Sequence, residues 1–145
     1  MQTTHAGEVH LGTQERASRA KGTRIAAWVA TASFVAMMGA SAILYLTGNP
    51  AALAALRQLG YPEYFRLLLG TAKLLGALAL LMPRPSALRE WAYAGFTFDL
   101  VAAVASHLLS GDSPAHAAPA VFALALVLAS YGLRRRATAL EAPAQ

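Results

Sequence analysis

Two residues of opposite charge stand out because each lies inside an apolar stretch. Lys73 falls in GTAKLLGALALLM (70–82), and Asp99 falls in WAYAGFTFDLVAAVASHLLS (91–110). A lysine near the middle of a bilayer costs roughly 2.5–3.5 kcal/mol on insertion scales, so such a residue usually pairs with an opposite charge or serves a function. An amine and a carboxylate held together could relay a proton or anchor a polar group of a ligand.

The short turn MPRPSALRE (82–90) predicts that these two residues meet. Helices joined by so short a connection form an antiparallel hairpin. Lys73 precedes Ser86 by thirteen residues and Asp99 follows it by thirteen, so both should lie at similar depth. We therefore expect an intramembrane ion pair. Two interpretations stay open: a structural clamp that fixes helix register, or a functional pair.

Other polar residues continue outward from this pair at helical spacing, which predicts an intramembrane polar seam. The seam consists of Lys73, Asp99, His107, Ser106, Arg66 and Glu63, with Asp112 and His116 at its outer mouth. Arg66 and Ser106 are equally far from Ser86 on its two sides, so we expect them to lie at the same depth. We expect Glu63 and Arg66 to form an i, i+3 ion pair. His107 is either part of the seam or simply hydrogen-bonded near the membrane interface, and it lacks a partner for an intramembrane metal site.

Composition favours lipid as the solvent. The chain has 145 residues, of which 57% are hydrophobic and 13% charged, and its mean hydropathy is +0.44. Soluble domains carry about 25% charged residues. The absence of cysteine excludes disulfides, thiolate metal sites and dithiol relays. The net charge of +5 comes from residues at the ends of apolar segments, which indicates membrane topology rather than nucleic-acid binding.

Apolar length predicts an all-α fold with four transmembrane helices, at about residues 25–46, 64–82, 91–110 and 115–133. Ser113 and Pro114 supply the cap and first residue of the fourth helix. Between the first two spans, NPAALAALRQLGYP (49–62) begins with Asn49 and Pro50, a typical helix start. This segment is too short to cross a bilayer. We interpret it as a short interfacial helix, with an irregular loop as the alternative.

Basic residues predict the orientation of the spans. Nine of the twelve Lys and Arg residues flank one side, namely Arg16, Arg19, Lys21, Arg24, Arg84, Arg89, Arg134, Arg135 and Arg136. The positive-inside rule then puts both termini in the cytoplasm. We interpret residues 1–24 and 135–145 as disordered cytoplasmic tails around a membrane domain at 25–134.

Three motifs give a resemblance to a known family. LGYPEYF (59–65), GTAKLLGALALL (70–81) and LREWAYAGFTFDLVAAVASHL (88–108) resemble the DoxX-like family of small bacterial membrane proteins. The resemblance implies a four-helix integral bundle in the bacterial cytoplasmic membrane. It assigns no reaction, although the wider group includes a subunit of a thiosulfate:quinone oxidoreductase.

Two functions remain open at this stage. The first is an accessory or quinone-interacting subunit of a membrane redox assembly. The second is a small-molecule or proton-handling protein that uses the seam between spans two and three. For either function we expect the lipid bilayer and either a redox-complex subunit or a second copy of the chain as partners. The sequence contains no Walker motif, nucleophile elbow or dinucleotide fingerprint. We therefore expect no catalysis by the chain alone, no intrinsic cofactor and no metal, with a quinone as the candidate ligand.

Overall fold

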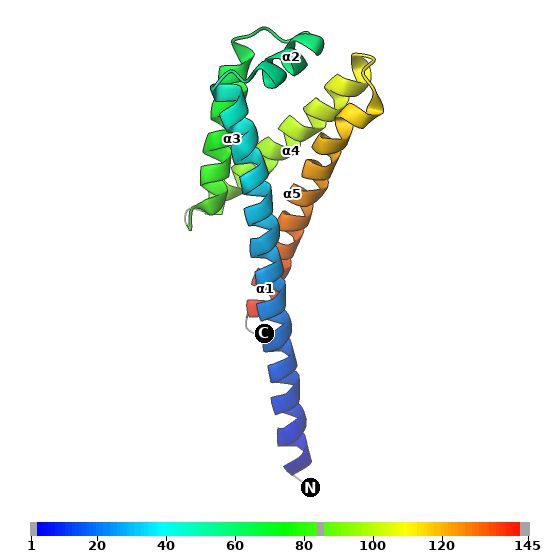
Figure 1. Cartoon of the computed structure of the whole chain (residues 1–145). Coiled ribbons are helices and arrows are strands. Elements are labelled where there is room, and N and C mark those ends of the chain that lie inside the picture. The colour runs from blue at the N-terminus through cyan, green and yellow to red at the C-terminus, as the bar shows by residue number, and fades with distance from the viewer. Residues whose placement is uncertain (1–2, 84–85, 143–145) are drawn as a thin grey trace.

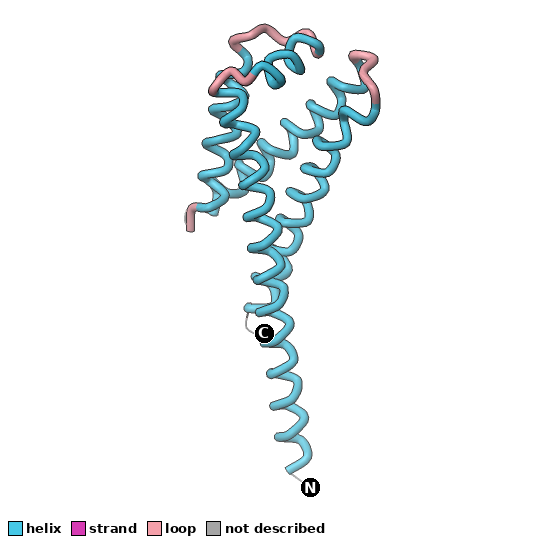
Figure 2. Tube along the Cα trace, viewed as in Figure 1, coloured by secondary structure: helices cyan, strands magenta, loops and turns pink. Residues whose placement is uncertain are grey.

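The computed structural model describes residues 3–83 and 86–142, and within them the chain forms helices and no strand. The helices are α1 (Thr3–Leu46), α2 (Pro50–Gln58), α3 (Phe65–Leu81), α4 (Ser86–Leu109) and α5 (Pro114–Glu141). Figure 2 shows that loops are confined to the short connections between them. The all-α class is confirmed.

Helices α1 and α4 each pack against both α3 and α5. In Figure 1, α1 forms the long axis, α3 runs beside its C-terminal half, and α5 runs beside the part nearer the N-terminus. The core lies where these helices meet, and it contains the fully buried side chains of Phe34, Leu80 and Val127. Phe34 meets Phe96 edge to face, with ring centroids 4.9 Å apart, an arrangement that aromatic pairs favour.

A buried hydrogen-bond network ties three of the helices together. The Ser130 hydroxyl in α5 lies 2.7 Å from the Thr31 hydroxyl in α1 and 2.9 Å from the Tyr93 hydroxyl in α4. Thr31 and Ser130 are completely buried. Hydroxyls that bond across helices in this way stabilise packing where water is excluded.

The N-caps predicted from the sequence are present at the starts of α2 and α5. The Asn49 side chain accepts the Ala51 N–H at 3.0 Å, and Pro50 occupies the first turn of α2. Ser113 accepts the Ala115 N–H at 3.4 Å at the start of α5. Residues 50–58 are therefore helical, as predicted, and the irregular-loop alternative is wrong.

Over residues 3–83 and 86–142, three helices are long and apolar enough to cross a membrane: Gln14–Leu46 within α1, α4 and α5. Large apolar side chains lie exposed on them, among them Trp91, Phe98 and Phe122, as expected for surfaces that face lipid. Helix α3 has 17 residues, or about 26 Å at 1.5 Å per residue. That length is slightly less than the ~30 Å hydrocarbon core, so the predicted second span, residues 64–82, is not among those three and the four-span count is not confirmed.

The expected tails need correction over the described residues, because α1 begins at Thr3 and α5 continues to Glu141. The two extensions pack on each other. Ala20 and Ala137 are buried, and a guanidinium nitrogen of Arg24 lies 3.7 Å from the Glu141 carboxylate. Side-by-side packing of the two helices accounts for the added turns from about Arg16 onward, where an Arg16 guanidinium nitrogen lies 3.3 Å from the Ala142 carbonyl oxygen. The first turns of α1 run past the end of α5 (Figure 1). Residues 1–2 and 143–145 lie outside the described part.

Candidate functional site

The Lys73 ammonium is enclosed and contacts one carboxylate. Lys73 is 7% exposed, and its Nζ lies 2.8 Å from Oδ2 of Asp99. The Met38 sulfur lies 4.0 Å from the same nitrogen, and the Tyr45 ring centroid lies 6.0 Å from it. A charge-assisted hydrogen bond of this kind is stronger than one between neutral groups. Helices α3 and α4 thus bring the two residues together at the point that the hairpin geometry indicates.

Farther from the turn, residues of α3 and α4 that are equally distant from it no longer lie side by side. Figure 1 shows α4 running away from α3 at an angle, until its C-terminal end lies beside the start of α5. Ser106 is therefore not opposite Arg66. Its hydroxyl instead lies 2.8 Å from the hydroxyl of Tyr61, which comes from the connection after α2. The polar seam that the sequence predicts is interrupted here because the two helices splay apart.

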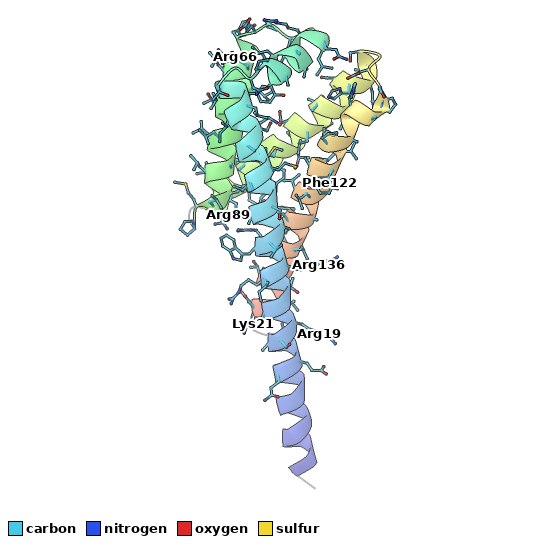
Figure 3. All side chains as sticks on the ribbon, viewed as in Figure 1. Arg19, Lys21, Arg66, Arg89, Phe122 and Arg136 are labelled. Atoms are coloured by element: carbon cyan, nitrogen blue, oxygen red, sulfur yellow. The ribbon has the colours of Figure 1, made fainter. Side chains whose placement is uncertain are left out.

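Arg66 and Glu63 have other partners than expected. Arg66 donates to the carbonyl oxygens of Tyr45 at 3.2 Å and Leu46 at 3.0 Å, at the C-terminus of α1. Basic side chains commonly satisfy the last carbonyls of a helix. Glu63 pairs with Arg57 at 3.3 Å, and both side chains are exposed. The expected Glu63–Arg66 ion pair is wrong, because the Arg66 guanidinium (labelled in Figure 3) instead donates to the last carbonyls of α1.

His107 belongs to a polar cluster at the α4–α5 connection. Its Nδ1 lies 2.7 Å from one Asp112 oxygen, and Nδ1 of His116 lies 2.6 Å from the other. The Gln58 amide in α2 donates to the same carboxylate at 3.1 Å. Side-chain hydrogen bonds from His116 and then His107 lower the pKa of Asp112 to about 2. The cluster fastens α2 to the connection. Within the described part, no group of three or more His, Cys, Asp and Glu residues could hold a metal ion.

Two cavities adjoin the ion pair. The ion-pair cavity, about 240 Å³, lies between α3 and α4 and is lined by Leu69, Ala72, Lys73, Gly76, Trp91, Ala92, Gly95, Phe96 and Asp99. The outer cavity, about 120 Å³, is lined by residues of α1, α2, α3 and α4 and the connection after α2, including Tyr45, Tyr61, Leu69, Asp99, Ser106 and His107. Leu69 and Asp99 line both cavities, so the carboxylate can be reached from either one.

Sequence reasoning missed the two tyrosines of the outer cavity. Tyr45 and Tyr61 lie near the ends of predicted spans, where amphipathic rings are common, so their position alone does not mark them as site residues. The structure places Tyr45 near Lys73 and bonds Tyr61 to Ser106. For Tyr61, the one signal in the sequence is the Tyr-Pro dipeptide of LGYPEYF, one of the motifs that resemble the family. For Tyr45, the contact depends on how α1 packs on α3, which no local pattern encodes.

These features define an all-helical protein with helices suited to a membrane and a buried Lys–Asp pair between two cavities. Residues 29–130 match the model of the DoxX-like family, and the chain belongs to that family. The match contains the ion pair and every lining residue of both cavities. No curated protein and no solved structure matches the chain.

Proposed function

We propose that this protein binds a quinone beside the Lys73–Asp99 pair and serves as an accessory subunit of a membrane redox assembly. The observation that carries the proposal is a paired amine and carboxylate at the edge of an otherwise apolar cavity. Ligand sites generally combine apolar walls with a few placed polar groups. The ammonium can donate to a quinone carbonyl oxygen while the aromatic ring of Phe96 contacts the head group. The chain contains no cysteine, so its role in the assembly is ligand binding rather than thiol redox chemistry.

Tryptophan fluorescence offers a direct test, because the chain has two tryptophans and one of them, Trp91, lines the ion-pair cavity. In a Trp28→Phe background, Trp91 is the only remaining indole. We expect ubiquinone-1 to quench its fluorescence with a saturable dependence on concentration in dodecylmaltoside. Quenching that rises linearly without saturation would reflect partitioning into the micelle and would overturn the proposal.

A cavity-filling variant makes this test specific. A Cβ atom at Gly95 meets nothing within 4 Å, and Gly95 lines the ion-pair cavity. We expect Gly95→Leu to fill the cavity and weaken ubiquinone-1 binding by about tenfold or more, the equivalent of about 1.4 kcal/mol. Gly39→Leu is the matched control, since Gly39 is also helical with open space beside it. Equal affinities in the two variants would place the quinone elsewhere.

The outer cavity supports a second candidate function, a proton or small-molecule path that ends at the ion pair. Asp99, Ser106 and His107 all line this cavity. Single-cysteine labelling is clean in a chain that has no cysteine. We expect Ser106→Cys to react quickly with a membrane-impermeant maleimide applied from the outer side, and not from the cytoplasmic side. Protection from both sides would favour a sealed structural pair.

The proposed topology has four spans, with α3 as the second and both termini in the cytoplasm of a bacterium. The start of α1 and the end of α5 lie at the end of the structure away from α2 (Figure 1), and these two helices carry seven of the twelve basic residues. Reporter fusions before Met1 and after Gln145 should both report the cytoplasm. Reports from opposite sides would mean that only three helices cross.

A further inference from the structure

We infer that a second site, at the other end of the helices, binds an anionic glycerophospholipid. A cavity of about 490 Å³ lies among α1, α4 and α5, and we call it the basic cavity. Its charged lining consists of Arg24, Arg89, Arg134 and Arg135, with Glu90 and Glu141. Arginines therefore exceed carboxylates by two. Arginine is well suited to bind phosphate oxygens in pairs.

Two of the arginines are held in place by neutral partners. The Arg134 guanidinium lies 4.9 Å from the Trp28 ring centroid, and its Nε donates to the Thr31 hydroxyl at 3.3 Å. Arg89 donates to the carbonyl oxygen of Met82 at 2.6 Å. The Nε of Arg89 is buried and has no hydrogen-bond partner among the described residues. Neither guanidinium is neutralised by these contacts, and a fixed positive charge loses little freedom when an anion binds.

Arg24 and Arg135 are less constrained. Arg24 lies 3.7 Å from the Glu141 carboxylate, with both side chains about half exposed, and such an exposed pair is worth little. Arg135 is exposed, and its guanidinium lies 5.8 Å from the Tyr131 ring centroid. Both side chains can therefore turn toward a phosphate in the basic cavity at low cost.

An apolar groove adjoins the basic cavity and lies between α4 and α5. This groove has a volume of about 310 Å³ and is lined by Ala94, Thr97, Phe98, Val127 and Leu128, together with Glu90, Tyr93 and Tyr131. The last three residues also line the basic cavity, so the groove adjoins it. A free phosphate would occupy only the basic cavity. A phospholipid uses both, with its headgroup among the arginines and an acyl chain along the groove.

The aromatic residues place the basic cavity at headgroup level. Trp28, Tyr93 and Tyr131 line it, and amphipathic rings favour the interface between water and hydrocarbon. Basic pockets between helices on the cytoplasmic side are a recognised way to hold anionic lipid headgroups. The position of the basic cavity at headgroup level, its excess of arginines and the adjoining apolar groove thus all favour a diacyl lipid with a negatively charged phosphate headgroup.

Native mass spectrometry of the full chain can test the charge requirement. We expect dioleoylphosphatidylglycerol to bind in preference to dioleoylphosphatidylcholine. Arg24→Gln/Arg135→Gln should weaken that binding by about tenfold or more, since each basic contact near a membrane surface contributes. The matched control is Arg19→Gln/Arg136→Gln, which removes the same charge from the same two helices. In the view of Figure 3, Arg19 and Arg136 lie on the side away from Arg89. If both double variants weakened lipid binding equally, the effect would come from general surface charge, and the proposed site would be refuted.

Thermal unfolding in detergent separates a lipid from a soluble anion. We expect dioleoylphosphatidylglycerol to raise the melting temperature in the presence of excess inorganic phosphate, and phosphate alone to raise it by less. Ala94→Leu, which narrows the apolar groove, should lower the lipid's effect without changing that of phosphate. A shift from phosphate alone as large as that from the lipid would overturn the proposal. So would full lipid stabilisation of the Ala94→Leu variant.

Discussion

Removing either member of the Lys73–Asp99 pair should destabilise the protein more than removing both. The Lys73 side chain is 9% exposed and the Asp99 side chain 23% exposed. Loss of one partner leaves a buried charge unpaired, at a cost of about 3–5 kcal/mol for a fully buried pair. Lys73→Met leaves Asp99 unpaired. Because Asp99 borders two cavities, the cost of this substitution should lie near the lower end of that range, about 3 kcal/mol. Asp99→Leu leaves the more enclosed ammonium alone and should cost more.

Thermal unfolding of the purified chain measures this double-mutant cycle. A loss of ~3 kcal/mol corresponds to roughly 10 °C in melting temperature for a chain of this size. We expect the double variant Lys73→Met/Asp99→Leu to regain most of that loss, because apolar side chains can replace a buried pair. The exposed pair Arg57–Glu63 is the control, and its coupling should stay below about 1 kcal/mol. Simple addition of the Lys73 and Asp99 effects would show that the ion pair contributes no coupling.

Two further predictions concern the packing around the site. Gly70→Ala should lower the melting temperature, because the new Cβ would lie 2.8 Å from a Leu46 side-chain carbon, whereas Gly132→Ala, with nothing within 4 Å, should leave it unchanged or slightly raised. The melting-temperature difference between the native chain and Asp112→Asn should persist at pH 6 and vanish as the pH falls from about 4 to 2. The sign follows from the lowered pKa of Asp112, since the native carboxyl binds its proton below the unfolded value of about 3.9. A melting-temperature difference between the native chain and Asp112→Asn that stayed constant from pH 6 to pH 2 would contradict the lowered pKa of Asp112.

The sequence predicts those parts of the site that depend on short-range geometry. The Lys73–Asp99 contact follows from a short turn, because positions equidistant from it lie at equal depth near the turn. The starts of α2 and α5 follow from Asn49 and Ser113, whose side chains bond backbone groups two residues away. In each case the determining residues are close in sequence or separated by one connection.

The remaining contacts depend on angles between helices, which no local pattern records. The angle between α3 and α4 makes their separation grow with each turn away from the connection, so Ser106 bonds Tyr61 rather than residues of α3. Arg66 reaches the end of α1, twenty residues back in the chain. The extension of α5 beyond its predicted span, and that of α1 as far as about Arg16, likewise depend on packing between residues more than a hundred positions apart.

Helix α4 connects the ion pair with the basic cavity. Tyr93, Phe96 and Asp99 are spaced three residues apart, so they lie on broadly one face. Tyr93 lines the basic cavity, Phe96 lines the ion-pair cavity, and Asp99 accepts the Lys73 ammonium. The Tyr93 hydroxyl also bonds Ser130, which fixes this face against α5. A displacement of α4 would therefore alter both cavities at once, and any effect of lipid on quinone affinity must equal the effect of quinone on lipid affinity. Quinone titrations should accordingly be compared at a fixed content of anionic lipid.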